Sequence, residues 1–166
     1  GAGAPPAGGM AGGPPPGGPP SVDDLAKEAT YGGVITSMRQ DLAALSLPEP
    51  VDVVWTSLNY HDLANPQRGA NRAAMNKSIF NALKPGGVYM VIDHAAPAGA
   101  GDSMTGTLHR VEGAFVRKEV EAAGFVFEAE SGILRNPADT YTLRLDGDTI
   151  PTQSDKFVYR FRKPAR

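Results

Sequence analysis

Two short polar segments of this 166-residue sequence carry the side chains best suited to chemistry. Asn59-Tyr60-His61-Asp62 follows the apolar run at 51–55, and Asp93-His94 follows the apolar run at 88–92. Imidazole titrates at about pH 6.5, so a histidine beside a carboxylate is suited to moving a proton or orienting a substrate. His109-Arg110, at the start of a predicted helix, is a third such segment.

All three histidines of the chain fall in these segments, and three interpretations compete. They act as general bases or substrate-orienting groups, they bind a metal with Asp62 and Asp93, or they cap helices and bond backbone carbonyls. No single helix or strand supplies two histidines at ligand spacing, so we assign no metal ligands. Ser57 lies at a strand end without a G-x-S-x-G elbow, which argues against a nucleophilic triad. Taken singly, each histidine is best explained by a structural role. Taken together, the three favour a functional site.

The elements that position these segments are predicted to form an α/β sheet. After residue 50, four strands are predicted, over 51–55, 88–92, 125–130 and 156–162. Two amphipathic helices are predicted, over 70–83 and 109–123. Lys84-Pro85-Gly86-Gly87 stops the first helix and Gly124 the second, and a polar hairpin connection spans 134–155. Because ligands bind at the carboxyl ends of parallel strands, the three polar segments are expected to share one edge of the sheet.

The N-terminal region divides at about residue 20. Residues 1–20 contain only Gly, Ala, Pro and Met, so we expect a disordered leader followed by one domain over 21–166. The glycines of the leader have no strand before them and no helix after them, which excludes a phosphate loop. Ser21 is a predicted N-cap for a helix over 22–28, and 34–38 is a predicted short strand.

The composition excludes several classes of function. Sixteen Lys and Arg against eighteen Asp and Glu give a net charge of −2, which provides no field to attract nucleic acid or an anionic membrane. Without cysteine there are no disulfides, thiolate metal sites or thiol nucleophiles. No apolar run reaches the roughly 18–20 residues of a membrane span, and no signal peptide is visible. The compartment stays open: cytoplasmic, or periplasmic if a signal peptide preceded this sequence.

A series of segments resembles class I S-adenosylmethionine-dependent methyltransferases, over roughly 34–164. Phe80-Asn81-Ala82-Leu83-Lys84-Pro85-Gly86-Gly87-Val88 is similar to the segment leading into the fifth strand of that family. Other pieces resemble a bacterial branch of predicted methyltransferases, and they occur in the same order. They are Asn59-Tyr60-His61-Asp62, Ile92-Asp93-His94, Leu108-His109-Arg110, 119–125 and 134–139. Upstream, Asp41-Leu42, Leu45-Ser46-Leu47-Pro48 and Val51-Asp52-Val53-Val54-Trp55 resemble the third and fourth strand region of the class I family.

The resemblance implies a partial Rossmann-like sheet, from the third to the seventh strand, with the last strand antiparallel. It implies S-adenosylmethionine as cofactor and a small-molecule methyl acceptor. The cofactor-binding residues that it implies are Asp41, Leu42, Thr56, Ser57 and Asn59. The substrate-side residues that it implies are Tyr60, Asp62, Asp93, His109 and Arg110. His61 or His94 is the expected base, because methyl transfer requires a positioned acceptor and, where needed, removal of its proton.

The Gly-rich loop and the ribose-binding acidic residue of the family have no counterpart in this sequence, so enzyme activity is left open. The leading interpretation is the C-terminal portion of a methyltransferase. The second is a non-catalytic oligomerisation or partner-binding module, which dimerises through the exposed apolar edge at 51–55. The third is a metal-dependent hydrolase built on the histidine and aspartate cluster: His61, Asp62, Asp93, His94 and His109.

Overall fold

The computed structural model describes residues 21–165, apart from 32, 64, 66, 68 and 146–152. The leader predicted over 1–20 lies outside the described residues, and so does part of the predicted connection over 134–155. The chain divides into two compact units, residues 1–39 and 40–166, and each is described here by itself. Within the described residues, no helix is long and apolar enough to cross a membrane.

The first unit contains short helical elements. Helix α1 (Val22–Leu25) begins at Ser21, whose side chain forms a reciprocal capping box with Asp24. It is shorter than the predicted helix over 22–28, and the 3₁₀ helix η1 (Ala29–Tyr31) follows it. The predicted strand over 34–38 was wrong, because these residues form no strand. A β-rich run needs a neighbouring strand to satisfy its backbone groups, and the four strands of the sheet all come from the second unit.

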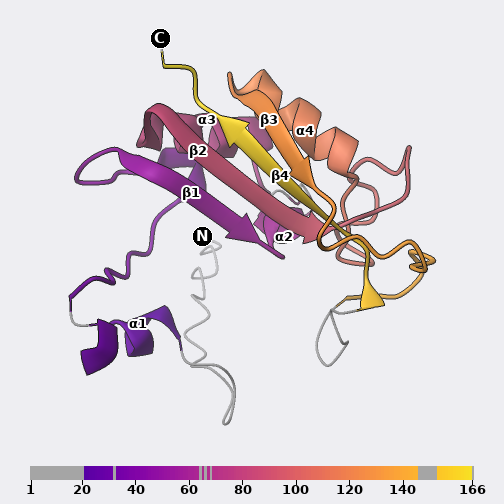
Figure 1. The fold of residues 1–166 in the computed structure, drawn as a ribbon, viewed down its shortest axis with the longest axis horizontal. Helices are drawn as coiled ribbons and strands as arrows, with labels where there is room; N and C mark the ends of the chain where they lie inside the picture. Colours follow the sequence, from indigo (N-terminus) through magenta and orange to yellow (C-terminus); the bar gives the residue numbers. More distant parts are fainter. Residues whose placement is uncertain are drawn as a thin grey trace, which may run out of the picture. The chain divides into compact units, whose positions relative to one another are not determined.

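The second unit is built on a four-stranded sheet, shown in Figure 1. The strands are β1 (Val51–Ser57), β2 (Leu83–His94), β3 (Val126–Ser131) and β4 (Lys156–Arg162). Their order is β1-β2-β4-β3, with β1 parallel to β2 and β4 antiparallel to both of its neighbours. The predicted α/β class and antiparallel last strand are therefore confirmed.

Strand β2 is longer than the predicted run over 88–92, since pairing begins at Leu83. The Lys-Pro-Gly-Gly segment ends the preceding helix as predicted and forms the irregular start of this strand. A Cβ atom on Gly87 would lie 2.9 Å from the Lys84 carbonyl oxygen and 3.1 Å from that of Asp52. Glycine therefore allows the start of β2 to approach β1 closely.

The two longer helices cover one face of the sheet (Figure 1). Helix α3 (Arg72–Ala82) is capped by the Asn71 side chain and matches the helix predicted over 70–83. Helix α4 (Gly113–Ala122) begins four residues later than predicted. Helix α4 starts later because Val111 pairs with Ala95 in an isolated parallel bridge. This bridge holds the chain extended before the helix.

The core lies between these helices and the sheet. Phe157, Tyr159 and Phe161 share one face of β4 as predicted, and all three are buried. Helix α3 contributes Met75 and Ile79, and α4 contributes Val116 and Val120. The 3₁₀ helix η2 (Leu42–Ala44) packs against α3 at the periphery of this core.

Strand β1 has an exposed apolar face. Val53 is 53% exposed and Trp55 is 59% exposed. They alternate with Val54 and Thr56, which lie on the face toward the helices, where Val54 packs against the core. The apolar edge predicted at this strand is therefore present in the described structure.

Candidate functional site

The carboxyl ends of β1 and β2 lie side by side, and polar residues follow both (Figure 1). Ser57 pairs with Ile92, and the Leu58 amide then donates to the Ile92 carbonyl at 2.9 Å. Leu58 has φ 55°, in the left-handed region, so the chain turns sharply into α2 (Tyr60–Leu63). This turn brings His61 back over the end of β2.

His61 and Asp93 form a buried pair at this edge. Both side chains are almost fully buried, at 4% and 0% exposure. The His61 ring Nδ1 lies 2.8 Å from one Asp93 carboxylate oxygen, and the His61 backbone amide donates to the other at 2.7 Å. The same carboxylate also accepts from the His94 amide at 2.7 Å. Asp93 therefore fixes both the position and the ring orientation of His61.

Asp62 and His109 complete the cluster on the other side of His61. The His61 Nε2 atom lies 3.7 Å from one carboxylate oxygen of Asp62, and His109 Nδ1 lies 3.6 Å from the other. The His61 and His109 rings meet edge-on, with centroids 5.3 Å apart. The sequence-predicted residues His61, Asp62, Asp93 and His109 are thus brought together.

His94 lies beside this cluster with a different environment. Its ring centroid is 6.0 Å from that of His61, and its Nδ1 lies 2.7 Å from the Ser154 hydroxyl. Burial lowers the pKa of His94 to about 4, against the opposing influence of Asp93. The ring is therefore neutral at physiological pH and binds a proton poorly there.

Two predicted substrate residues are part of the framework. Tyr60 is fully buried, its hydroxyl accepts from the Asn76 amide at 2.9 Å, and burial raises its pKa to about 12. Arg110 is also fully buried and binds both carboxylate oxygens of Asp139, at 2.7 and 3.2 Å. It donates further to the Ala95 carbonyl, so it holds the loop after β2 to the connection before β4.

The predicted cofactor residues are spread over two regions. Ser57 and Asn59 are exposed at the end of β1, whereas Thr56 is 9% exposed and its hydroxyl lies 3.4 Å from the Tyr89 hydroxyl. Asp41 caps η2 by accepting from the Ala43 amide at 2.9 Å, and the half-buried Leu42 packs against the core. Asp41 is therefore tied to η2, whereas Ser57 and Asn59 lie at the edge that carries the histidines.

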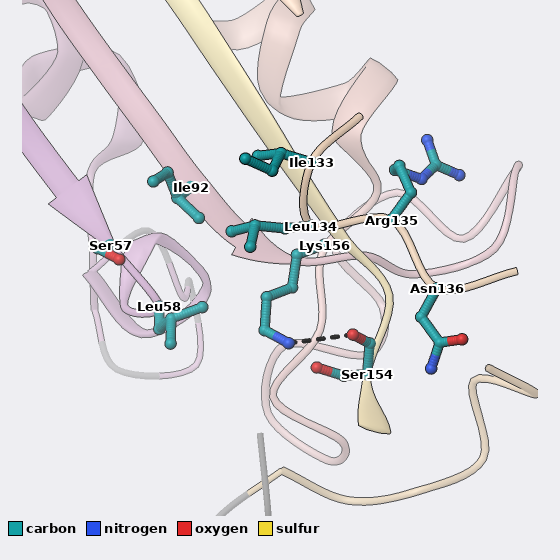
Figure 2. A pocket seen from close by; sticks show the side chains of 9 residues that line it. All are labelled: Ser57, Leu58, Ile92, Ile133, Leu134, Arg135, Asn136, Ser154 and Lys156. Atoms are coloured by element: carbon teal, nitrogen blue, oxygen red, sulfur yellow. Dashed lines mark hydrogen bonds between the residues drawn. The ribbon is translucent and has the colours of Figure 1, made fainter. Parts of the chain in front are cut away.

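An open pocket of about 460 Å³ lies at the same end of the sheet (Figure 2). Its walls combine apolar side chains with a few polar groups from three strands and the β3–β4 connection. The lining residues are Ser57, Leu58, Ile92, Ile133, Leu134, Arg135, Asn136, Ser154 and Lys156. The Lys156 Nζ donates to the Ser154 carbonyl at 3.0 Å, and burial lowers the pKa of Lys156.

Sequence reasoning missed Ser154 and Lys156 as residues of this region. They come from the start of β4 and the connection before it, where no motif marked them. The segment 134–139 was quoted in the family resemblance, and it supplies three further lining residues, Leu134, Arg135 and Asn136. That ordered resemblance was the signal that pointed to this connection.

Comparison with solved structures gives a consistent set of neighbours. The [4+2]-cyclase SpnF matches with a TM-score of 0.62 and 18% identity, over 87% of this chain and 61% of SpnF. The N-methyltransferase NodS from Bradyrhizobium japonicum WM9, in complex with S-adenosyl-L-homocysteine, matches with a TM-score of 0.57 and 13% identity, over 86% and 61%. An S-adenosylmethionine-dependent methyltransferase from Clostridium acetobutylicum matches with a TM-score of 0.52 and 10% identity, over 87% and 72%.

The fold is that of class I methyltransferases. This chain spans 61% of the length of both SpnF and the NodS complex. No family model matches the sequence, and no curated protein matches it either.

Proposed function

We propose that this chain is the C-terminal portion of an S-adenosylmethionine-dependent methyltransferase that acts on a small molecule. The observation that supports this proposal most directly is the buried His61–Asp93 pair at the carboxyl edge of a methyltransferase-type sheet. A pocket of about 460 Å³ at the same end of the sheet, whose lining includes Ser57 and Ile92, has a size suited to a small ligand. We also place the chain in the bacterial branch of predicted methyltransferases, on the ordered segments that resemble it.

S-adenosylmethionine is the proposed cofactor, and it supplies an electrophilic methyl group on a sulfonium. Ser57 and Asn59 fit a contact with it, because both are exposed at the carboxyl end of β1. Thr56 supports this end from within the sheet, through its hydroxyl contact to Tyr89. For Asp41 to reach an adenine, its carboxylate has to leave the Ala43 amide. We therefore assign the direct contacts to Ser57 and Asn59.

The residues of the chain have two tasks in methyl transfer: to position the acceptor and to activate its attacking atom. His61 is better placed than His94 for activation, because Asp93 fixes its ring while Nε2 faces the cluster. His94 has a pKa of about 4, so it is a weak proton acceptor at neutral pH. His94 and Asp62 then orient the acceptor.

Calorimetric titration with S-adenosylmethionine and S-adenosylhomocysteine tests the proposal. It uses this chain and a form extended by any coding sequence found upstream of it. We expect the extended form to bind both ligands, and a Ser57→Asp variant, which places a bulkier charged group at the β1 end, to bind more weakly. Absence of binding to both forms would overturn the methyltransferase assignment.

A second function is favoured by the exposed face of β1. Val53 and Trp55 present apolar surface on the first strand of the sheet, which suits a non-catalytic module that pairs with a second copy. Sedimentation velocity separates the two proposals. A dimer that a Trp55→Ser variant dissociates, together with no cofactor binding, would favour the module; a monomer at all concentrations would reject it.

A further inference from the structure

Three side chains at the sheet edge have the composition and spacing of metal ligands. His61, Asp62 and His109 each offer one ligand atom, and these atoms lie within 4.8 Å of one another. This is the one such group among the residues that the structure describes. The Asp62 carboxylate lies between the two histidines, with one oxygen 3.7 Å from His61 Nε2 and the other 3.6 Å from His109 Nδ1.

Asp93 prepares His61 for this role. The carboxylate lies 2.8 Å from Nδ1, which assigns the ring proton to that nitrogen and leaves the Nε2 lone pair directed at the cluster. A carboxylate behind a histidine is the usual arrangement at metal sites, where it fixes the tautomer and makes the imidazole a better ligand. Asp93 is fully buried and also bonds the His61 amide, so this orientation is part of the folded framework.

His109 is held in place by its backbone. Its φ is 56°, in the left-handed region that a residue with a side chain rarely adopts. The next residue, Arg110, is fully buried and anchored to Asp139 and to the Ala95 carbonyl. Strained conformations persist where the surrounding structure imposes them, and they concentrate at functional sites. Here the strain accompanies a ring that faces Asp62, with a side chain only 13% exposed.

We propose that His61, Asp62 and His109 bind a divalent first-row transition cation of the Zn²⁺ type. Two imidazoles and one carboxylate suit such ions, whereas Mg²⁺ prefers oxygen ligands alone. With bonds of about 2.1 Å, tetrahedral ligand atoms lie roughly 3.4 Å apart, so the three ligand atoms, which lie within 4.8 Å of one another, need to move closer together to bind one cation. Three protein ligands leave a coordination position open, as in catalytic zinc sites.

The open position gives the site a chemical use, and this use rests on the proposed function. An acceptor hydroxyl bound there has its pKa lowered by the cation and releases its proton to solvent. A lone pair of that oxygen then attacks the methyl carbon while the carbon–sulfur bond breaks, and S-adenosylhomocysteine leaves. His61 then activates the acceptor through the cation instead of taking its proton directly. Cation binding itself depends on the three ligands and not on methyl transfer.

The test is a metal titration of the tag-free chain after removal of bound metal with a chelator. We expect one equivalent of Zn²⁺ by calorimetry, and one equivalent of Co²⁺ by its visible absorption bands. His109→Asn is the sharpest variant, because asparagine tolerates a positive φ and so preserves the loop. It and Asp62→Asn remove a ligand each, and we expect both to weaken binding by more than the roughly 10- to 100-fold typical of outer-shell changes.

Two further variants complete the design. Asp93→Asn is expected to weaken Zn²⁺ binding by roughly 10- to 100-fold, as an orienting residue does. Asp52→Asn, which removes an exposed carboxylate outside the cluster, is expected to keep both the stoichiometry and the affinity. The proposal is overturned if the unaltered chain takes up no cation, or if His109→Asn and the unaltered chain bind it equally. Cofactor titration on the same samples reports separately on the methyltransferase proposal.

Discussion

Asp93 is the residue on which the candidate site depends most directly. Its carboxylate is fully buried and accepts three hydrogen bonds, from His61 Nδ1 and from the amides of His61 and His94. A carboxylate has acceptor capacity on both oxygens, and hydrogen bonds to a charged group are stronger than neutral ones. The side chain therefore joins the end of β2 to α2 as well as orienting the imidazole.

Replacing Asp93 by asparagine tests this joining role. The amide group has one acceptor oxygen in place of two, so at least one buried donor loses its partner. We expect the free energy of unfolding to fall by about 1–3 kcal/mol in urea denaturation followed by circular dichroism. Asp52→Asn is the matched control, because Asp52 pairs with Lys84 at an exposed position, and such pairs contribute about 0–1 kcal/mol. Equal losses for the two variants would contradict the role given to Asp93.

At the scale of elements, the connection between β3 and β4 is organised by a buried ion pair. Arg110 is fully buried and Asp139 has a side-chain exposure of 4%. Burial raises the pKa of Asp139, but hydrogen bonds from Arg110 and from the amides of Asp155 and Tyr141 hold it below its usual value. The pair thus ties the loop after β2 to a segment that comes about 30 residues later.

The Asp139→Asn variant is expected to lose about 3–5 kcal/mol of stability at pH 7, because the Arg110 charge stays buried without its partner. A lowered pKa stabilises the fold fully above the unfolded value of about 3.9 and loses that effect as pH falls through the folded value. The stability difference between the unaltered chain and the variant should therefore shrink below about pH 4. Urea titrations at several pH values measure it. Glu121→Gln, at an exposed pair with Arg117, should show neither the loss nor the pH dependence.

Helix α4 packs closely against β4 at Gly113, the first residue of the helix. A Cβ on Gly113 would lie 2.5 Å from the Tyr159 hydroxyl oxygen and 3.3 Å from a Phe157 ring carbon. Gly113→Ala is expected to destabilise the chain by about 1–3 kcal/mol in thermal or urea unfolding, because these rings are packed in the core. Gly132→Ala, where the nearest atom is 3.7 Å away on Arg135, is the control and should be close to neutral. Equal stability of the two variants would show that α4 shifts without strain.

The elements differ in how far the sequence could predict them. Strand β4 was predicted at its observed bounds, because alternation of Phe157, Tyr159 and Phe161 is a local signal. The start of α4 was not, since it depends on the bridge from Val111 to Ala95, a contact between distant segments. The strand predicted over 34–38 failed for the related reason that local β preference forms no strand without a partner.

The residues of the candidate site also differ in how far the sequence could predict their positions. The end-of-strand rule located the three histidines at one edge, because strand polarity can be read from the order of elements. The burial of Tyr60 and Arg110 could not be read in this way, since both depend on partners, Asn76 and Asp139, that no motif connects to them.

At the scale of the whole molecule, the fold alone does not determine which reaction a protein of this type carries out. Among the neighbours with this fold, SpnF is a [4+2]-cyclase and NodS an N-methyltransferase, so a shared sheet does not determine a reaction. The activity of this chain has to be argued from its own edge residues, and the metal titration and the cofactor titration examine two independent parts of that argument.

The exposed face of β1 also provides a whole-molecule probe. Trp55 is the single tryptophan of the chain and is 59% exposed. We expect its fluorescence in dilute native protein to be that of a hydrated indole, readily quenched by acrylamide and little changed on unfolding in urea. A shift to shorter wavelength as protein concentration rises would report burial of β1 in a second copy. A native emission already strongly blue-shifted at high dilution would contradict the exposure of this face.

The insertion of β4 between β2 and β3 has a consequence for how the chain folds. Val88 pairs with Arg162 and His94 with Lys156, so β2 lacks its second neighbour until the chain has been synthesised past residue 162. Closing such long loops has an entropic cost that is not recovered until the pairing forms, and this slows folding. During translation, we therefore expect the helices and the β1–β2 pair to form first, as an incomplete domain. Strand β4 is added to the sheet last.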